Sequence, residues 1–326
     1  MITDLNKNAF MCWNVFAPRL CIALLICAPF AGLGTANAQS GGGRADVAST
    51  QVSIGTSATE PTVEINGHAI ASPNDPDLGE QAILKRSEGY KPFIATVSVP
   101  IYYTSNVALS RSGEQDDWIE APVVSLTYQP RLTNNLYAIF TLREQLFYYD
   151  RFDSLNFGSF DAEAGLVYVV PEWHNAVFRA EFFYNRLTEK NSFESFFNNY
   201  SIFLNAEVPF RIGRAQQFTL GTDANISVDA DPEQPRRNDY EVYLGYNLAV
   251  TRAISLDAVA RVVARQYQLT DRVDVSEILA TSANFNISRY FTASAISTLA
   301  ANQSNHSVFD YKVANVGGLL SLSVKF

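Results

Sequence analysis

The most constraining feature of the sequence is a strict alternation of side-chain types in its last segment. From Gly318 to Phe326, every second residue is glycine or apolar, and the residues between them include two serines and a lysine. Alternate side chains of a β-strand point to opposite faces, so this period of two separates an apolar face from a mostly polar one. The same pattern recurs from residue 92 onward and predicts an all-β chain.

About twelve segments of this kind follow one another between residues 92 and 326, with those near 119–129, 136–149 and 291–303 alternating less cleanly. Short connections at 130–134, 171–175, 211–214, 251–253 and 288–290 alternate with longer ones at 111–117, 150–156, 188–198, 230–238, 270–274 and 302–310. Short turns at one end and longer loops at the other are typical of an antiparallel up-and-down barrel with an even number of strands.

The composition leaves two classes of β protein open, a soluble sandwich and a transmembrane barrel. No apolar run of eighteen residues follows residue 38, which excludes a helical membrane protein. Aromatic residues make up 13% of the chain and gather near both ends of the predicted strands. Two aromatic girdles are expected where a barrel crosses the membrane surfaces, so the pattern favours the transmembrane barrel.

The N-terminal segment 1–38 has the pattern of a secretory signal peptide. Lys7 and Arg19 precede an apolar run over residues 20–30, and an Ala-x-Ala motif ends at Ala38. The run is too short to span about 30 Å of hydrocarbon, which disfavours a membrane anchor. We therefore expect export and cleavage after Ala38.

All three cysteines, Cys12, Cys21 and Cys27, lie in this segment. The exported chain would then hold neither a disulfide framework nor a thiolate metal site. Lipidation at Cys27 is disfavoured because Ile26, the residue before it, is not small.

The region 92–326 resembles the porin-like outer-membrane β-barrels of Gram-negative bacteria, through the signal peptide, the alternating strands, the girdles and the closing Phe326. The resemblance implies a transmembrane antiparallel up-and-down β-barrel of about 12 strands whose partners are outer-membrane lipid and lipopolysaccharide. It also implies that the outer-membrane assembly machinery recognises Phe326. The last strand is expected to pair with the strand that begins near Pro92, because closure removes the edges of the sheet.

Residues 39–91 differ from the rest. They begin with three glycines, contain Pro61, Pro73 and Pro76, and show no sustained periodicity. We interpret them as a flexible periplasmic N-terminal arm, with a plug inside the barrel as the alternative. The run Val63–Ile65 before Asn66-Gly67 is a candidate for a small hairpin.

The polar faces of the predicted strands should line the lumen. The charged residues expected there are Arg143, Glu163, Arg179, Glu181, Glu207, Asp223, Glu241, Asp257, Arg261 and Arg265. Acids and bases are interleaved on neighbouring strands, which predicts cross-strand ion pairs. Such a network either only braces the barrel or lines a water-filled path, and its excess of acids weakly favours cations. Arg236 and Arg237 are expected on an outer loop, in contact with lipopolysaccharide phosphates or solvent, or attracting anions at the entrance.

Other function classes find little support. A net charge of −9 argues against nucleic acid as a partner. The exported chain has only His68, His174 and His306, and neither metal-ligand spacing nor a phosphate-binding loop occurs. We therefore expect no metal, no cofactor and no enzyme.

The resemblance to porin-like barrels implies a channel for passive diffusion of small hydrophilic solutes, expected to be monomeric because about twelve strands are fewer than in the trimeric porins. The alternative is a closed structural, adhesion or assembly barrel that acts through loops 188–198 and 230–238 or through the arm. A membrane-embedded hydrolase using His306 beside Ser304 is a third hypothesis.

Overall fold

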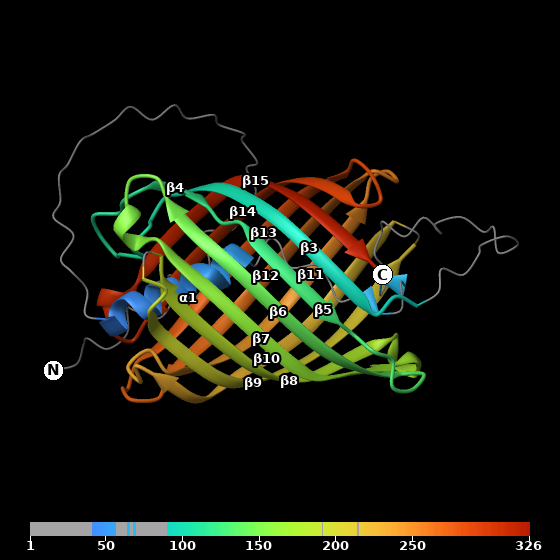
Figure 1. Ribbon diagram of the computed structural model, residues 1–326, viewed down its shortest axis with the longest axis horizontal. Coiled ribbons are helices and arrows are strands. Elements are labelled where there is room, and N and C mark those ends of the chain that lie inside the picture. The colour runs from blue at the N-terminus through green and yellow to red at the C-terminus, as the bar shows by residue number, and fades with distance from the viewer. Residues whose placement is uncertain (1–40, 57–63, 66–67, 70–89, 191, 214) are drawn as a thin grey trace, which may run out of the picture. The chain divides into compact units, whose positions relative to one another are not determined.

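A closed β-barrel forms most of the protein (Figure 1). The computed structural model describes residues 41–56, 64–65, 68–69, 90–190, 192–213 and 215–326; the expected signal peptide lies outside them. The barrel strands are β3 (Phe93–Thr104), β4 (Asp117–Glu120), β5 (Val123–Tyr128), β6 (Leu136–Tyr149), β7 (Phe157–Val170), β8 (Ala176–Glu189), β9 (Ser195–Ile212), β10 (Gln216–Asp231), β11 (Arg237–Ala249), β12 (Ile254–Tyr267), β13 (Val273–Asn286), β14 (Phe291–Ser304) and β15 (Tyr311–Lys325). Each pairs antiparallel with its neighbours, so the predicted up-and-down order is confirmed.

Two of these segments are halves of one strand, which gives twelve strands in the barrel. Ile101 of β3 is opposite Glu120 of β4, and three residues further along, Ser98 is opposite Val123 of β5. The register is therefore continuous across the break at Pro122, whose missing N–H interrupts the ladder.

The last strand closes the ring against the first, as predicted. β15 pairs with β3 over eleven residue pairs, including Leu320 with Val99. The seam ends in two reciprocal backbone hydrogen bonds of 3.1 and 3.0 Å between Phe93 and Phe326, whose rings stack with centroids 5.6 Å apart. Closure pairs every strand edge, the condition for a sheet that spans lipid.

Alternation assigns the two faces of the sheet. Along β3, Val97, Val99 and Ile101 are more than 40% exposed, whereas the intervening Ser98 and Tyr102 are buried. The same contrast runs through the other strands and leaves a belt of exposed large apolar side chains around the outside. Stacked aromatic rings, such as Phe93 on Tyr128, lie on this outer face near the turn ends. The apolar-out pattern predicted from the sequence is therefore confirmed.

The loop-end aromatic girdle is only partly as expected. Tyr102, Phe147, Tyr149 and Tyr267 are all less than 7% exposed and lie on the inner face, not the outer one. Neighbouring residues of a strand face opposite ways, so of a pair such as Tyr102-Tyr103 only one can face outward. A cluster of aromatics expected at the membrane surface thus belongs partly to the interior.

A β-bulge in β10 turns outward an acid, Asp229, that the alternation along this strand would place on the inner face. The register against β9 shifts between Ser227 and Asp229, and Asp229 then pairs with Tyr200, an outward residue. The extra residue of a bulge reverses the alternation beyond it. Asp229 is therefore exposed on the outer face.

The connections lie at the predicted places, but the predicted contrast in length between the two ends is mostly lost, because the strands extend further toward the loop end than expected. Only residues 190–194 and 232–236 of the predicted loops 188–198 and 230–238 remain outside strands. Short 3₁₀ turns occupy η1 (Asp153–Leu155), η2 (Pro171–Trp173) and η3 (Ser307–Phe309). The surfaces required by the adhesion hypothesis are therefore small.

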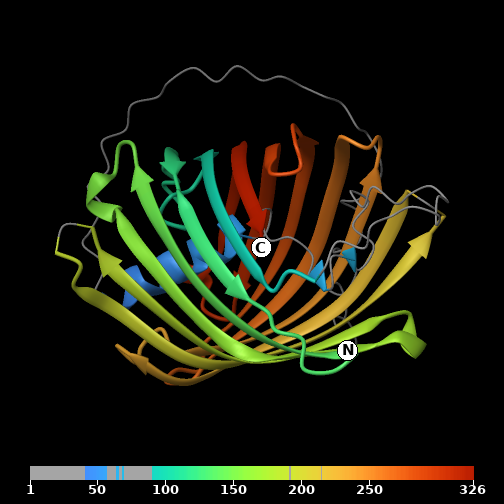
Figure 2. The same ribbon diagram turned by 45° about the vertical axis from the view of Figure 1, so that its right-hand side comes forward.

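The region 39–91 contains regular structure that the sequence analysis did not predict. Helix α1 (Gly41–Thr56) lies on the concave side of the sheet (Figure 2). The strands β1 (Glu64–Ile65) and β2 (His68–Ala69) pair in the hairpin expected near Asn66-Gly67, and the rest of 57–89 lies outside the described residues. No helix among the described residues is long and apolar enough to cross a membrane.

Candidate functional site

Helix α1 bridges the inside of the barrel at its loop end. Its contacts include β8 and β9 on one side and β14 on the other. Five strands lie between β8 and β14 in either direction around the ring of twelve, so these contacts lie on opposite walls. Sixteen residues of α-helix span about 24 Å. We call the residues that contact α1 the helix seat.

The strongest polar contact of the seat holds the carboxylate of Asp46. Arg237 Nη1 and Tyr267 Oη each donate to Oδ1 at 2.7 Å, and Arg272 Nη1 donates to Oδ2 at 2.9 Å. Both oxygens are engaged, and the Asp46 side chain is 16% exposed. We call Arg237, Arg272 and Tyr267 the arginine cradle.

The cradle determines the protonation state of Asp46. Burial alone would raise the pKa of this carboxyl, but the positive charges of Arg237 and Arg272 and the hydrogen bond from Tyr267 outweigh it. The pKa of Asp46 is therefore held below its usual value of 3.8. The group is ionised at neutral pH, and its contacts are charge-assisted hydrogen bonds, which are about twice as strong as neutral ones.

Two further polar anchors lie on other walls. Arg44 donates to Glu189 Oε1 at 2.8 Å and places its guanidinium 4.6 Å from the ring centre of Phe196. Gln51, which is fully buried, donates to the carbonyl oxygens of Asn106 and Val107 in the β3–β4 connection. The helix is thus fixed at three points around the ring.

Apolar contacts complete the seat. Ala45 and Ala48 are buried against inward aromatics that include Tyr102 and Phe147. Ile54 is fully buried among Val263, Ile278 and other aliphatic residues of β12–β15. Burying one isoleucine stabilises an arrangement by about 1.5–3 kcal/mol. The inner wall is therefore largely apolar where α1 packs on it, and a second apolar cluster that includes Tyr137, Ile139, Val167 and Val177 lies on β6–β8.

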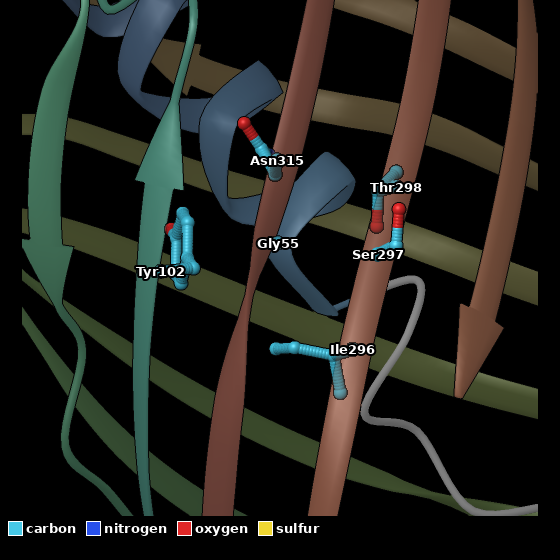
Figure 3. A pocket seen from close by; sticks show the side chains of 6 residues that line it. All are labelled: Gly55, Tyr102, Ile296, Ser297, Thr298 and Asn315. Atoms are coloured by element: carbon cyan, nitrogen blue, oxygen red, sulfur yellow. The ribbon is translucent and has the colours of Figure 1, made fainter. Parts of the chain in front are cut away.

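The last turn of α1 packs less completely. A small pocket there is lined by Gly55, Tyr102, Ile296, Thr298 and Asn315 (Figure 3). The Tyr102 hydroxyl and both amide atoms of Asn315 are buried and find no hydrogen-bond partner among the described residues. Each such group costs about 1–3 kcal/mol. These costs oppose the anchors, so the seat holds α1 less tightly than its ion pairs suggest.

The strand register places all ten charged residues that were expected at the lumen wall on the inner face of the sheet. On β11 and β12, for example, these residues lie an even number of positions from Arg237 or Tyr267, so they face the same side as these two residues, which contact α1. Arg143 is directly opposite Asp161, and Arg179 lies 3.3 Å from Glu181. Acids and bases thus lie near one another on the inner face, within β8 and between β6 and β7.

The remaining predicted residues have neighbours on adjacent strands. Arg261 donates to Glu241 at 3.1 Å. Asn205 donates to Asp223 at 2.5 Å, and Asn284 donates to Asp257 at 2.5 Å. Arg265 is 1% exposed and donates to Ser276. Side-chain amides thus donate hydrogen bonds to two of the predicted acids, Asp223 and Asp257.

One aromatic side chain joins three strands of the polar wall. Tyr243 lies over Gly221 on the neighbouring strand, where a Cβ atom would collide with the ring. Its hydroxyl donates to Glu207 Oε2 at 2.7 Å and accepts from Asn205 at 3.2 Å. Only glycine at position 221 lets the ring cross the strand.

The sequence analysis missed the residues that hold α1. Arg237 was expected with Arg236 on an outer loop, but it is the first residue of β11, points inward and is 10% exposed. Only Arg236 lies outside, where it donates to the carbonyl of Val228. The prediction that Arg237 lies on an outer loop is wrong because strand β11 begins earlier than expected. For Asp46 and Arg272, nothing in the sequence except their charge indicated that they would pair.

The contacts of His306 and Ser304 do not form the catalytic arrangement that the hydrolase hypothesis requires. His306 Nε2 lies 2.9 Å from Asp271 Oδ1, while the hydroxyl of Ser304 accepts the backbone N–H of His306. Both contacts are exposed and hold the loop together. Within the described residues, no group of three or more His, Cys, Asp or Glu side chains is placed to bind a metal.

Solved structures share this architecture. An outer membrane channel from Pseudomonas putida F1 is 14% identical, with a TM-score of 0.53 over 72% of this chain and 96% of that one. The chain therefore shares the fold of this structure. The translocator domain of the autotransporter NalP from Neisseria meningitidis (12% identity, TM-score 0.41, 74% and 90% covered) and the KdgM porin (10%, 0.36, 68% and 97%) are more distant. No protein family and no curated protein matches the sequence.

Proposed function

We propose that the protein is an outer-membrane channel for passive diffusion of small hydrophilic solutes, closed at its mouth by α1. The observation that carries this proposal is the contrast between the two parts of the interior. The wall is polar and charged around the ten predicted residues, as a water-filled path requires. At the loop end, a separate helix bridges opposite strands through three polar anchors.

The same proposal places the apolar outer face in lipid, with lipopolysaccharide around the loop ends and the assembly machinery recognising Phe326. The exposed belt of leucine, valine and aromatic side chains supports it, since a soluble protein rarely exposes so large an apolar surface. Export by the segment 1–38 completes the localisation that we propose.

Planar-bilayer recording tests the channel. The variant replaces residues 41–56 by an equal length of Gly-Ser repeats, which keeps the chain length and removes the anchors. We expect low conductance from the native protein and sustained conductance from the variant. A matched variant, Ser49→Ala, should behave as native, because among the described residues the Ser49 hydroxyl donates within α1, to the carbonyl of Asp46 at 3.1 Å. Absence of current from a correctly folded replacement variant would reject the channel.

That negative result would favour the alternative of a closed structural or assembly barrel. The helix across the mouth is the observation that speaks for it, since a permanently occupied lumen conducts nothing. The conductance of the variant without α1 therefore distinguishes the two functions, because only the channel would conduct.

The pH dependence of closure follows from Asp46. Because the arginine cradle lowers its pKa, the closing contacts are fully present above the usual value of 3.8 and are lost only as pH falls through the lowered value. We expect the conductance of the native protein to be unchanged between pH 8 and pH 5, with opening confined to stronger acid. Opening that begins near pH 6 would show that a different group controls closure.

A further inference from the structure

The arginine cradle keeps its shape through contacts within the barrel. Arg237 Nε donates to Asp239 at 3.0 Å, and Arg272 Nη2 lies 2.5 Å from Asp274. The guanidinium of Arg272 also stacks 4.0 Å from the ring centre of Tyr267. None of these contacts involves α1, so the cradle is already arranged before Asp46 enters it.

The charges of the barrel wall at this place do not balance without the helix. Three arginines, Arg237, Arg265 and Arg272, face two acids, Asp239 and Asp274. This leaves one positive charge in excess, and the carboxylate of Asp46 cancels it. Arg265 Nη2 is also buried with no hydrogen-bond partner among the described residues. The wall is therefore complementary to one monovalent anion.

The way in which Asp46 fills the cradle identifies the anion. Its two oxygens receive donors from different sides, two on Oδ1 and one on Oδ2. Arginine forks recognise the planar, two-oxygen geometry of a carboxylate, and phosphate at neutral pH would bring more charge than the excess of one.

We propose that the arginine cradle is a binding site for a small solute bearing one carboxylate, and that such a solute opens the channel by displacing Asp46. Asp46 is an internal stand-in for this ligand. Binding releases one of the three anchors of α1, and the unpartnered groups of Tyr102 and Asn315 then gain water as the helix leaves. The proposal rests on the proposed function for its opening step, whereas the binding site stands on the cradle alone.

Recording in the presence of benzoate tests the opening step, with benzamide as an uncharged probe of equal size and constant ionic strength. Benzoate should raise the open probability of the native channel roughly tenfold, within the usual range of ligand coupling, and benzamide should not. Arg272→Met should abolish the response, while Arg111→Met, at a loop arginine that bonds to the carbonyl of Ser307, should keep it. Equal responses to both probes would overturn the opening step.

Calorimetric titration tests the site without any channel activity. The full chain carrying Asp46→Ala lacks the internal competitor and should bind benzoate about tenfold more tightly than the native chain. Adding Arg272→Met should remove the binding. If folded Asp46→Ala binds no benzoate, the site is rejected even where the α1 replacement conducts. If it binds but the replacement does not conduct, the proposed function fails and the site remains.

Discussion

Charge reversal at Asp46, as Asp46→Lys, is expected to convert the closed protein into an open channel without any ligand. The substitution removes a carboxylate that accepts three hydrogen bonds and places an ammonium group against Arg237 and Arg272. Breaking a buried ion pair costs about 3–5 kcal/mol. The population of the open state should therefore rise roughly 150-fold to 4,000-fold, as measured by open probability in planar bilayers.

Two variants show whether this effect belongs to the cradle. Ser49→Lys places the same ammonium group one turn further along α1, with a charge change of +1 against +2 for Asp46→Lys, and should leave closure nearly native. Asp46→Asn keeps the size of the side chain and loses its charge, so its open probability should be intermediate. If Ser49→Lys opens the channel as much as Asp46→Lys, the net charge of the helix controls closure and the cradle does not.

The barrel itself should be most sensitive at Gly317, on the closing seam. A Cβ atom there would lie 2.5 Å from Cα of Tyr102 and still closer to the carbonyl oxygen of Ile101, both backbone atoms that cannot turn away. We expect Gly317→Ala to destabilise the folded barrel by about 3 kcal/mol, the upper part of the usual range for overpacking. The urea midpoint of the detergent-solubilised protein and the heat-sensitive folded band on gels measure this loss.

The next residue is the matched control. A Cβ atom at Gly318 points to the outer face and meets its nearest neighbour, the carbonyl oxygen of Ser294, at 3.6 Å, an ordinary contact. Gly318→Ala should therefore fold as well as the native chain. Similar losses at both positions would mean that the seam is sensitive to any added methyl group, and that the close approach of β3 and β15 at Gly317 has no special role.

The sequence was informative wherever a period of two decided the outcome. Strand number, closure between β15 and β3 and the inward facing of residues such as Glu181 and Arg261 all follow from alternation, because a shift of one residue would expose polar groups to the apolar side. Asp229 shows the limit. A single extra residue at the bulge after Ser227 reverses the facing, and nothing in the local sequence marks it.

The seat of α1 was beyond prediction for a different reason. The helix begins with three glycines, each of which disfavours helix by about 1 kcal/mol relative to alanine, and has no broad apolar face. Its stability comes from groups supplied by distant strands, such as Arg272 and Glu189. In hindsight, the spacing of Ala45, Ala48 and Val52 is helical, but three small residues would not distinguish a helix from a tail.

The position of the helix in the mouth determines the solute concentration needed for opening. Asp46 is joined by the chain to the barrel that it closes, so its effective concentration near the arginine cradle is set by the tether and is constant. Tethered groups of this kind act at effective concentrations of the order of mM. A free carboxylate of similar intrinsic affinity would have to reach about that concentration outside the cell before it displaced Asp46. The channel would then stay shut in dilute surroundings and admit solutes only when they are plentiful.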